Sequence, residues 1–385
     1  MKKKILILIT LFTVIVLGVT TIPEKVSADE LSDNIQSELD NLDLEELQDF
    51  YDGIMNGKDK DFNTVLGNIL SGEYYSDYGS VADYIIKIIF DDIFKMLPMF
   101  LSVIAIALLC GIVQSVKSTF LSEGVSEIIF FVCVLSIVLI LSAEMLSIWN
   151  TAKNIIENIS ILNEIMSPII LTLMVASGGK VSASVYKPTV TFLTGGIINI
   201  IVYAVFPLIG LMIVFSVINC FSGSVKLSKF SEFITGTVKW IIGISFTVYG
   251  LFLSVQGISS ATFDGISIKA AKYAISNSIP IIGGYLKDGF DLMVAGSVLI
   301  KNAVGVVGVI ALFYVILSPV IHMAVVSLLL KLTAAFSEPL SDSNVSNLCM
   351  GFSKGVTYIT VAMLAVGFML FITILLMIFS ANAFI

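Results

Sequence analysis

The chain has 385 residues, of which 57% are hydrophobic and 13% are charged. Soluble globular domains carry about 25% charged residues, so this composition excludes a soluble protein and predicts a polytopic helical membrane protein. All 21 basic residues are lysine, so the bidentate arginine contacts that recognise phosphate are absent and nucleic-acid binding is not expected. The net charge of -8 is concentrated in residues 29–80, which hold 14 acidic residues against two lysines.

Residues 1–28 have the pattern of a secretory signal peptide. Three lysines precede an apolar stretch from Ile5 to Val19, and the small-residue sequence Val26-Ser27-Ala28 follows before the first aspartate. An uncleaved anchor helix is the alternative. Both interpretations place the acidic region of residues 29–80 outside the cytoplasm.

The acidic region has two possible structures. Its apolar residues are spaced by threes and fours, which predicts two or three short amphipathic helices that need a partner surface or the membrane. A solvated acidic linker is the alternative, because low hydrophobicity with high charge also marks disorder. In residues 81–96 the charges fall four apart with alternating sign, which predicts an amphipathic helix lying on the membrane surface.

Residues 97–385 form the predicted transmembrane domain, an all-α arrangement of about 7 to 8 transmembrane helices. Hydropathy places spans near 97–116, 126–148, 190–218, 238–257, 292–317, 319–334 and 355–380. Two further stretches, 161–176 and 265–291, are too polar or too short for a clean span, so we expect two short broken or re-entrant helices. Eight spans would place the lysines of residues 265–291 in the cytoplasm.

The stretch 265–291 combines Pro280, Gly283 and Gly284 with three charged residues next to the longest apolar run. Irregular backbone at membrane depth is tolerated only where protein or a water-filled cavity covers it. We therefore expect these three residues to shape a re-entrant or interfacial helix that faces a protein-lined cavity.

Three ionisable residues fall inside apolar segments. Lys301 lies well inside its span and is a candidate for a pore-facing or ion-paired role, or for a lysine that snorkels to the interface. Glu144 lies near the end of a span and could reach the interface. His322, the only histidine, is expected to be packed or pore-lining.

A shift of 112 residues aligns the chain with itself in part, so that 161–257 falls on 273–369. Pro168 then coincides with Pro280, and each is followed by two isoleucines. A duplication of this kind would resemble the repeated halves of transporters, whose broken helices meet where solute binds.

No catalytic or cofactor-binding pattern is present. The sequence lacks HExxH, the phosphate loop and GxSxG, so we expect neither an enzyme nor a resident cofactor. The four cysteines, Cys110, Cys133, Cys220 and Cys349, have no metal or redox spacing and are expected to be apolar packing residues.

The whole arrangement resembles the stage III sporulation protein AE family. The resemblance rests on the signal peptide, the acidic exported region, the Met166–Ile170 and Ala176–Ser184 motifs and, above all, Lys272 to Gly284. It implies a permease-like subunit, in the mother-cell membrane around the forespore, of a channel or secretion-like apparatus linking the two cells. The implied partners are other stage III sporulation proteins and the forespore stage II protein Q. A stand-alone small-solute permease or secondary transporter is the alternative.

Overall fold

The computed structural model describes residues 39, 42–55, 61–72, 78–116, 123–221, 227–278, 283–338 and 343–380. Nearly all of these residues are helical, and no strand occurs among them. The predicted all-α membrane fold is therefore confirmed. The signal peptide and Pro280 lie outside the described residues.

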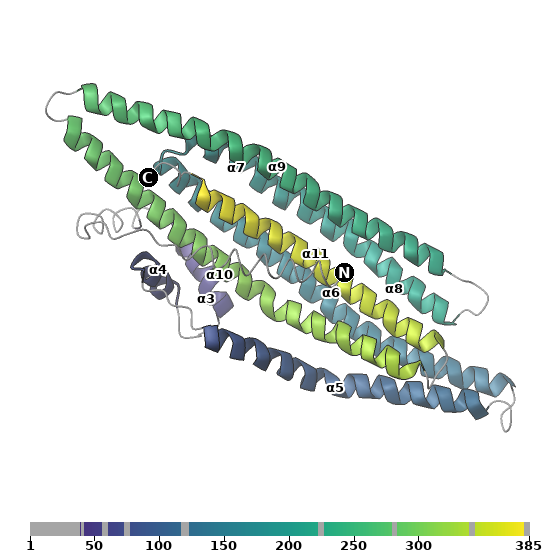
Figure 1. Cartoon of the computed structure of the whole chain (residues 1–385). Helices are drawn as coiled ribbons and strands as arrows, with labels where there is room; N and C mark the ends of the chain where they lie inside the picture. The colour runs from purple at the N-terminus through teal and green to yellow at the C-terminus, as the bar shows by residue number, and fades with distance from the viewer. Residues whose placement is uncertain are drawn as a thin grey trace.

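Five long helices and one interrupted helical rod form an elongated bundle (Figure 1). The long helices are α5 (Tyr78–Val116), α6 (Glu123–Ala176), α9 (Ser228–Ser278), α10 (Gly283–Ser337) and α11 (Ser343–Phe379). The rod consists of α7 (Lys180–Phe192), two π-helical turns at Leu193–Ile198 and Ile201–Val205, and α8 (Phe206–Phe221). At 1.5 Å per residue, α10 is about 80 Å long, far more than the hydrocarbon thickness of a bilayer.

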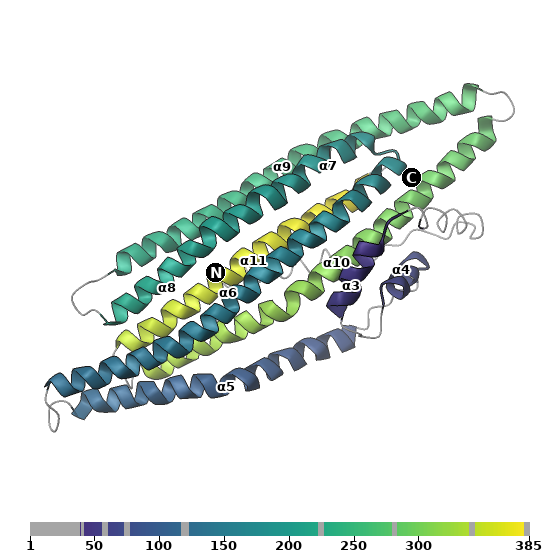
Figure 2. The same cartoon turned by 180° about the vertical axis from the view of Figure 1, so that it is seen from behind.

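Helix α11 lies in the middle of the bundle and packs on α10, α6 and α8 (Figures 1 and 2). Two glycines of α10 permit this close packing. A Cβ atom on Gly305 would lie 2.4 Å from Ile378 of α11, and one on Gly308 would lie 2.2 Å from Met166 of α6. Small residues at helix contacts therefore bring the backbones together, as in other membrane bundles.

Six helices among the described residues are long and apolar enough to cross a membrane, where hydropathy led us to expect about 7 to 8 spans. The segments 126–148 and 161–176 belong to one helix, α6, and 292–317 and 319–334 belong to α10. Pro168 and Pro319 lie inside these helices and do not end them. A buried helix tolerates an internal proline when its neighbours hold both halves in place.

Within the stretch 265–291, the described residues form the two arms of a helical hairpin. It comprises the end of α9 and the start of α10, and Gly283 and Gly284 are the first two residues of α10. An ion pair joins the two arms, with Lys272 Nζ 2.6 Å from Asp291 Oδ1. Both views show the hairpin extending beyond the ends of α6 and α11 (Figures 1 and 2).

The acidic region contributes two short helices, α3 (Glu45–Met55) and α4 (Phe62–Leu70), that pack on the bundle through α6 and α10. The rings of Tyr51 and Phe62 meet edge to face at 6.0 Å, and the Phe62 amide donates to Asp52 Oδ1 at 3.0 Å. Residues 81–96 continue directly into the first span as part of α5.

The continuous helices change the expected sidedness of the chain. Figure 1 shows α3, α4, the end of α9 and the start of α10 toward one end of the bundle, and the end of α8 and the start of α9 at the other. We predict that Asp49→Cys in α3 and Lys269→Cys in α9 react with an impermeant thiol reagent from the same side of the membrane. Lys229→Cys, at the start of α9, should react from the opposite side.

These three positions are exposed, and the experiment requires a background in which the four native cysteines are alanine. Reaction of Lys229→Cys from the same side as Asp49→Cys, with Lys269→Cys reacting from the opposite side, would support the eight-span arrangement and contradict the six-helix topology.

Candidate functional site

Three ionisable side chains from three helices meet inside the bundle: Asp92 of α5, Glu144 of α6 and His322 of α10. We call them the His322 cluster. His322 Nδ1 lies 3.7 Å from Asp92 Oδ2, and His322 Nε2 lies 3.4 Å from Glu144 Oε1. Their side chains are 17 to 22% exposed. One imidazole ring therefore stands between two carboxylates, with one nitrogen directed to each.

Helical periodicity explains why Asp92 reaches the interior. It lies three, four and seven residues after Ile89, Ile88 and Ile85, so it shares their face of α5. The predicted charge stripe of α5 contains Asp91 and omits Asp92. An acidic residue on the apolar face of a helix was the signal that could have found it.

The geometry of the His322 cluster does not suit a metal ion. A metal takes one imidazole nitrogen as a ligand, whereas here the two carboxylates lie at opposite nitrogens. Among the described residues, no three histidine, cysteine, aspartate or glutamate side chains are grouped so that they could hold a metal ion.

The surroundings of Glu144 combine an apolar cavity with a group of hydroxyls. Met99, Leu141, Val326 and Phe352 are among the residues that line a small cavity next to Glu144. Hydroxyl groups also join α10 to α11, where Ser327 Oγ lies 3.1 Å from Ser353 Oγ and 3.0 Å from Thr357 Oγ1. Such interhelical hydrogen bonds contribute about 0.6 kcal/mol each in membrane proteins.

Lys301 lies far from the His322 cluster. It precedes His322 by 21 residues on α10, a rise of about 30 Å. Its side chain is fully buried, and Nζ donates a hydrogen bond to the backbone oxygen of Ser380, just after α11 ends. A cation at a helix C-terminus satisfies an open carbonyl and stabilises the helix dipole. Lys301 therefore fastens α11 to α10.

The remaining predicted site residues are not brought together with Glu144. Pro168 is exposed on α6, and Gly283 and Gly284 lie at the start of α10 in the projecting hairpin. The role of these residues in lining a cavity or in a conformational change stays a prediction.

The α6–α7 turn fits against α9 through one buried carboxylate. Asp264 of α9 is fully buried and accepts hydrogen bonds from the backbone amides of Val181 at 2.8 Å and Ser182 at 2.9 Å. It thereby caps the N-terminus of α7, where amide groups have no partner within the helix. In the same turn, Gly178 has a φ of +89° and packs on Ile268.

The four cysteines lie on four different helices, α5, α6, α8 and α11. Cys110, Cys220 and Cys349 are buried and Cys133 is half-buried, and all four are free thiols. Cys110 lies within hydrogen-bonding reach of Cys133.

The amino-acid sequence of the chain is similar to those of known proteins. The family model of stage III sporulation protein AE matches residues 60–381 of this chain. The chain belongs to the stage III sporulation protein AE family. A curated member from Bacillus subtilis (strain 168), also described as stage III sporulation protein AE, is 29% identical over 282 residues, which cover 73% of this chain and 70% of that protein. No solved structure matches the chain.

In this member of the stage III sporulation protein AE family, the sequence motif Ala176–Ser184 coincides with the α6–α7 turn. We predict that Gly178→Ala lowers the free energy of unfolding by about 1–3 kcal/mol, because the positive φ is strained for alanine. In addition, the new methyl group would lie 2.7 Å from Ile268. Thermal unfolding in detergent measures the loss.

Gly243→Ala in α9 is the matched control, because nothing lies within 4 Å of its Cβ position. Equal stability of the two alanine variants would show that the turn is not strained. In an Ile268→Ala background, Gly178→Ala should cost less than it does in the native chain, because the contact is gone and only the backbone strain remains.

Proposed function

We propose that this chain is the permease-like membrane subunit of a channel or secretion-like apparatus that links the mother cell and the forespore. It would lie in the mother-cell membrane around the forespore. Its partners would be other stage III sporulation proteins and the forespore stage II protein Q. Family membership supports the role in sporulation, and six long apolar helices support a place in the membrane.

The proposal rests on one end of the bundle, where α3, α4 and the projecting α9–α10 hairpin lie. A helix pair that is packed on α6 and α10 presents its outer surface in a fixed position. On α3, the acidic residues Glu45, Glu46 and Asp49 are exposed, while Leu47 and Tyr51 are buried against the bundle. A rigid acidic surface of this kind suits docking to basic partner surfaces.

The stand-alone permease receives less support from the structure. That hypothesis used Lys301 as the solute-binding cation, but Lys301 donates to the carbonyl at the end of α11. Reconstitution of the chain alone in liposomes distinguishes the two functions. The subunit proposal expects no solute movement, and a solute flux that Lys301→Ala abolishes would favour the permease.

Reversal of the α3 surface charge tests the docking proposal. We predict that Glu45→Lys, Glu46→Lys and Asp49→Lys together reduce recovery of the other stage III proteins and the stage II protein Q about tenfold, which corresponds to roughly 1.4 kcal/mol of binding. Spore formation should fall in parallel. Affinity purification from sporulating cells and counts of heat-resistant spores measure both effects.

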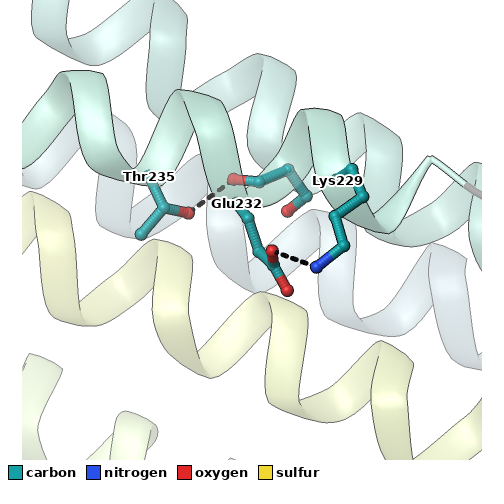
Figure 3. Close-up of polar contacts among 4 residues, drawn as sticks. Lys229, Glu232 and Thr235 are labelled. Carbon is teal, nitrogen blue, oxygen red and sulfur yellow. Dashed lines mark hydrogen bonds and ion pairs between the residues drawn. The ribbon is translucent and has the colours of Figure 1, made fainter.

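The control exchanges a charged pair at the opposite end of the bundle. Figure 3 shows Lys229 and Glu232 on α9, where Lys229 Nζ lies 2.9 Å from Glu232 Oε2 and both side chains are exposed. Lys229→Glu with Glu232→Lys preserves the pair and the net charge, and it should leave partner recovery unchanged. Normal recovery with the reversed α3 surface would contradict the docking role.

A further inference from the structure

We propose that the His322 cluster is a proton-binding site that works as a latch between α5 and the rest of the bundle. In the closed state the imidazole is protonated and holds Asp92 of α5 and Glu144 of α6 at once. Loss of the proton releases α5. This proposal concerns the isolated chain and does not depend on the cargo or the partners of the apparatus.

The protonation state of His322 decides how many N–H groups its ring carries. An imidazolium has an N–H group on each ring nitrogen, whereas a neutral imidazole has only one. The two carboxylates lie at the two different nitrogens of His322. Only the protonated ring can therefore present an N–H group to both carboxylates, and deprotonation leaves a lone pair facing one of them.

The charges around the ring favour the same state. Among the described residues, the charged groups that act on the imidazole are Asp92 and Lys95 of α5 and Glu144 of α6. With His322 protonated, two negative charges face two positive charges. With His322 neutral, one negative charge is left in excess among side chains that are only 17 to 22% exposed, which is unfavourable.

The carboxylate oxygens are buried without being tightly bound. Asp92 Oδ2 and Glu144 Oε1 have almost no exposed surface and make no hydrogen bond, so the imidazole at 3.4 to 3.7 Å is the cation that compensates them. These distances are longer than a good hydrogen bond and correspond to an ion pair. A contact of this kind depends on the charge of the ring, so deprotonation weakens the attachment of α5 at this point.

Two features of helix α5 permit it to bend near Asp92: its position at the edge of the bundle and its internal proline. It lies at the edge of the bundle and contacts mainly α6 and α10 (Figures 1 and 2). Pro98, six residues after Asp92, removes the backbone hydrogen bond to the carbonyl of Phe94 and creates a position where the helix can bend. The part of α5 before Pro98 carries Asp92 and leads to α4. Release of Asp92 would therefore act on this part of α5.

The test measures the distance between α5 and α10 in the full chain. Spin labels are placed at Phe90→Cys and Leu328→Cys, two exposed positions, in a background with alanine at the four native cysteines. Pulsed electron spin resonance in nanodiscs records the distance from about pH 5 to about pH 9, a range that brackets the titration of histidine. We expect a short, narrow distance at low pH that becomes longer and broader as the pH rises.

Two substitutions of His322 separate the charge from the ring. His322→Gln has no charge and should give the long, broad distance at every pH, whereas His322→Lys keeps a cation and should give the short distance at every pH. A matched label pair, Leu109→Cys with Leu328→Cys, reports on α5 beyond Pro98 and should not change with pH.

The same distance at every pH in the native sequence overturns the latch. Movement in the His322→Lys variant also overturns it, because that result would assign the pH response to another group. If His322→Gln fails to fold, the native titration and His322→Lys still decide the question. Circular dichroism and gel filtration of each variant establish folding.

Discussion

The structure depends on one constraint: a polar group within an apolar bundle must find its partner inside the protein. Water supplies none at membrane depth, and an unsatisfied backbone group costs several kcal/mol. Long uninterrupted helices meet this constraint for the backbone, since each residue is bonded within its own helix. The bundle consequently needs special polar contacts only at helix ends and at the few ionisable side chains on its interior faces.

The helix ends show how the chain meets that constraint. Asp264 supplies both oxygens to the open amides at the start of α7, and Lys301 supplies its ammonium group near the end of α11. Asn219 Oδ1 likewise accepts the amide of Leu227 at 2.7 Å in the α8–α9 turn. In each case a side chain from one helix fixes the end of another element. These contacts add to the register that close apolar packing already sets, as at Gly305 against Ile378.

Much of the fold could be predicted from the sequence, and the errors have physical causes. Composition and hydropathy sufficed for an all-α membrane protein. The segments 126–148 and 161–176, and likewise 292–317 and 319–334, were expected to be separate, whereas α6 and α10 run through them without a break. Glu144 was identified as a candidate, but its partners could not be found, because Asp92 and His322 come from helices whose relative rotation depends on packing across the whole bundle. Spacing within one segment carries no information on that rotation.

Lys301 and His322, both on α10, differ in what surrounds them, and this difference separates a structural residue from a switch. Lys301 is fully buried and donates to a backbone carbonyl, a partner that has no charge to lose and no proton to exchange. His322 stands between two carboxylates whose inward oxygens make no hydrogen bond, so the strength of both contacts follows the charge of one ring. A lysine in the place of His322 would keep its charge near physiological pH, so the contact would not respond to pH. Histidine is the residue whose charge changes near physiological pH, and it lies where three helices meet.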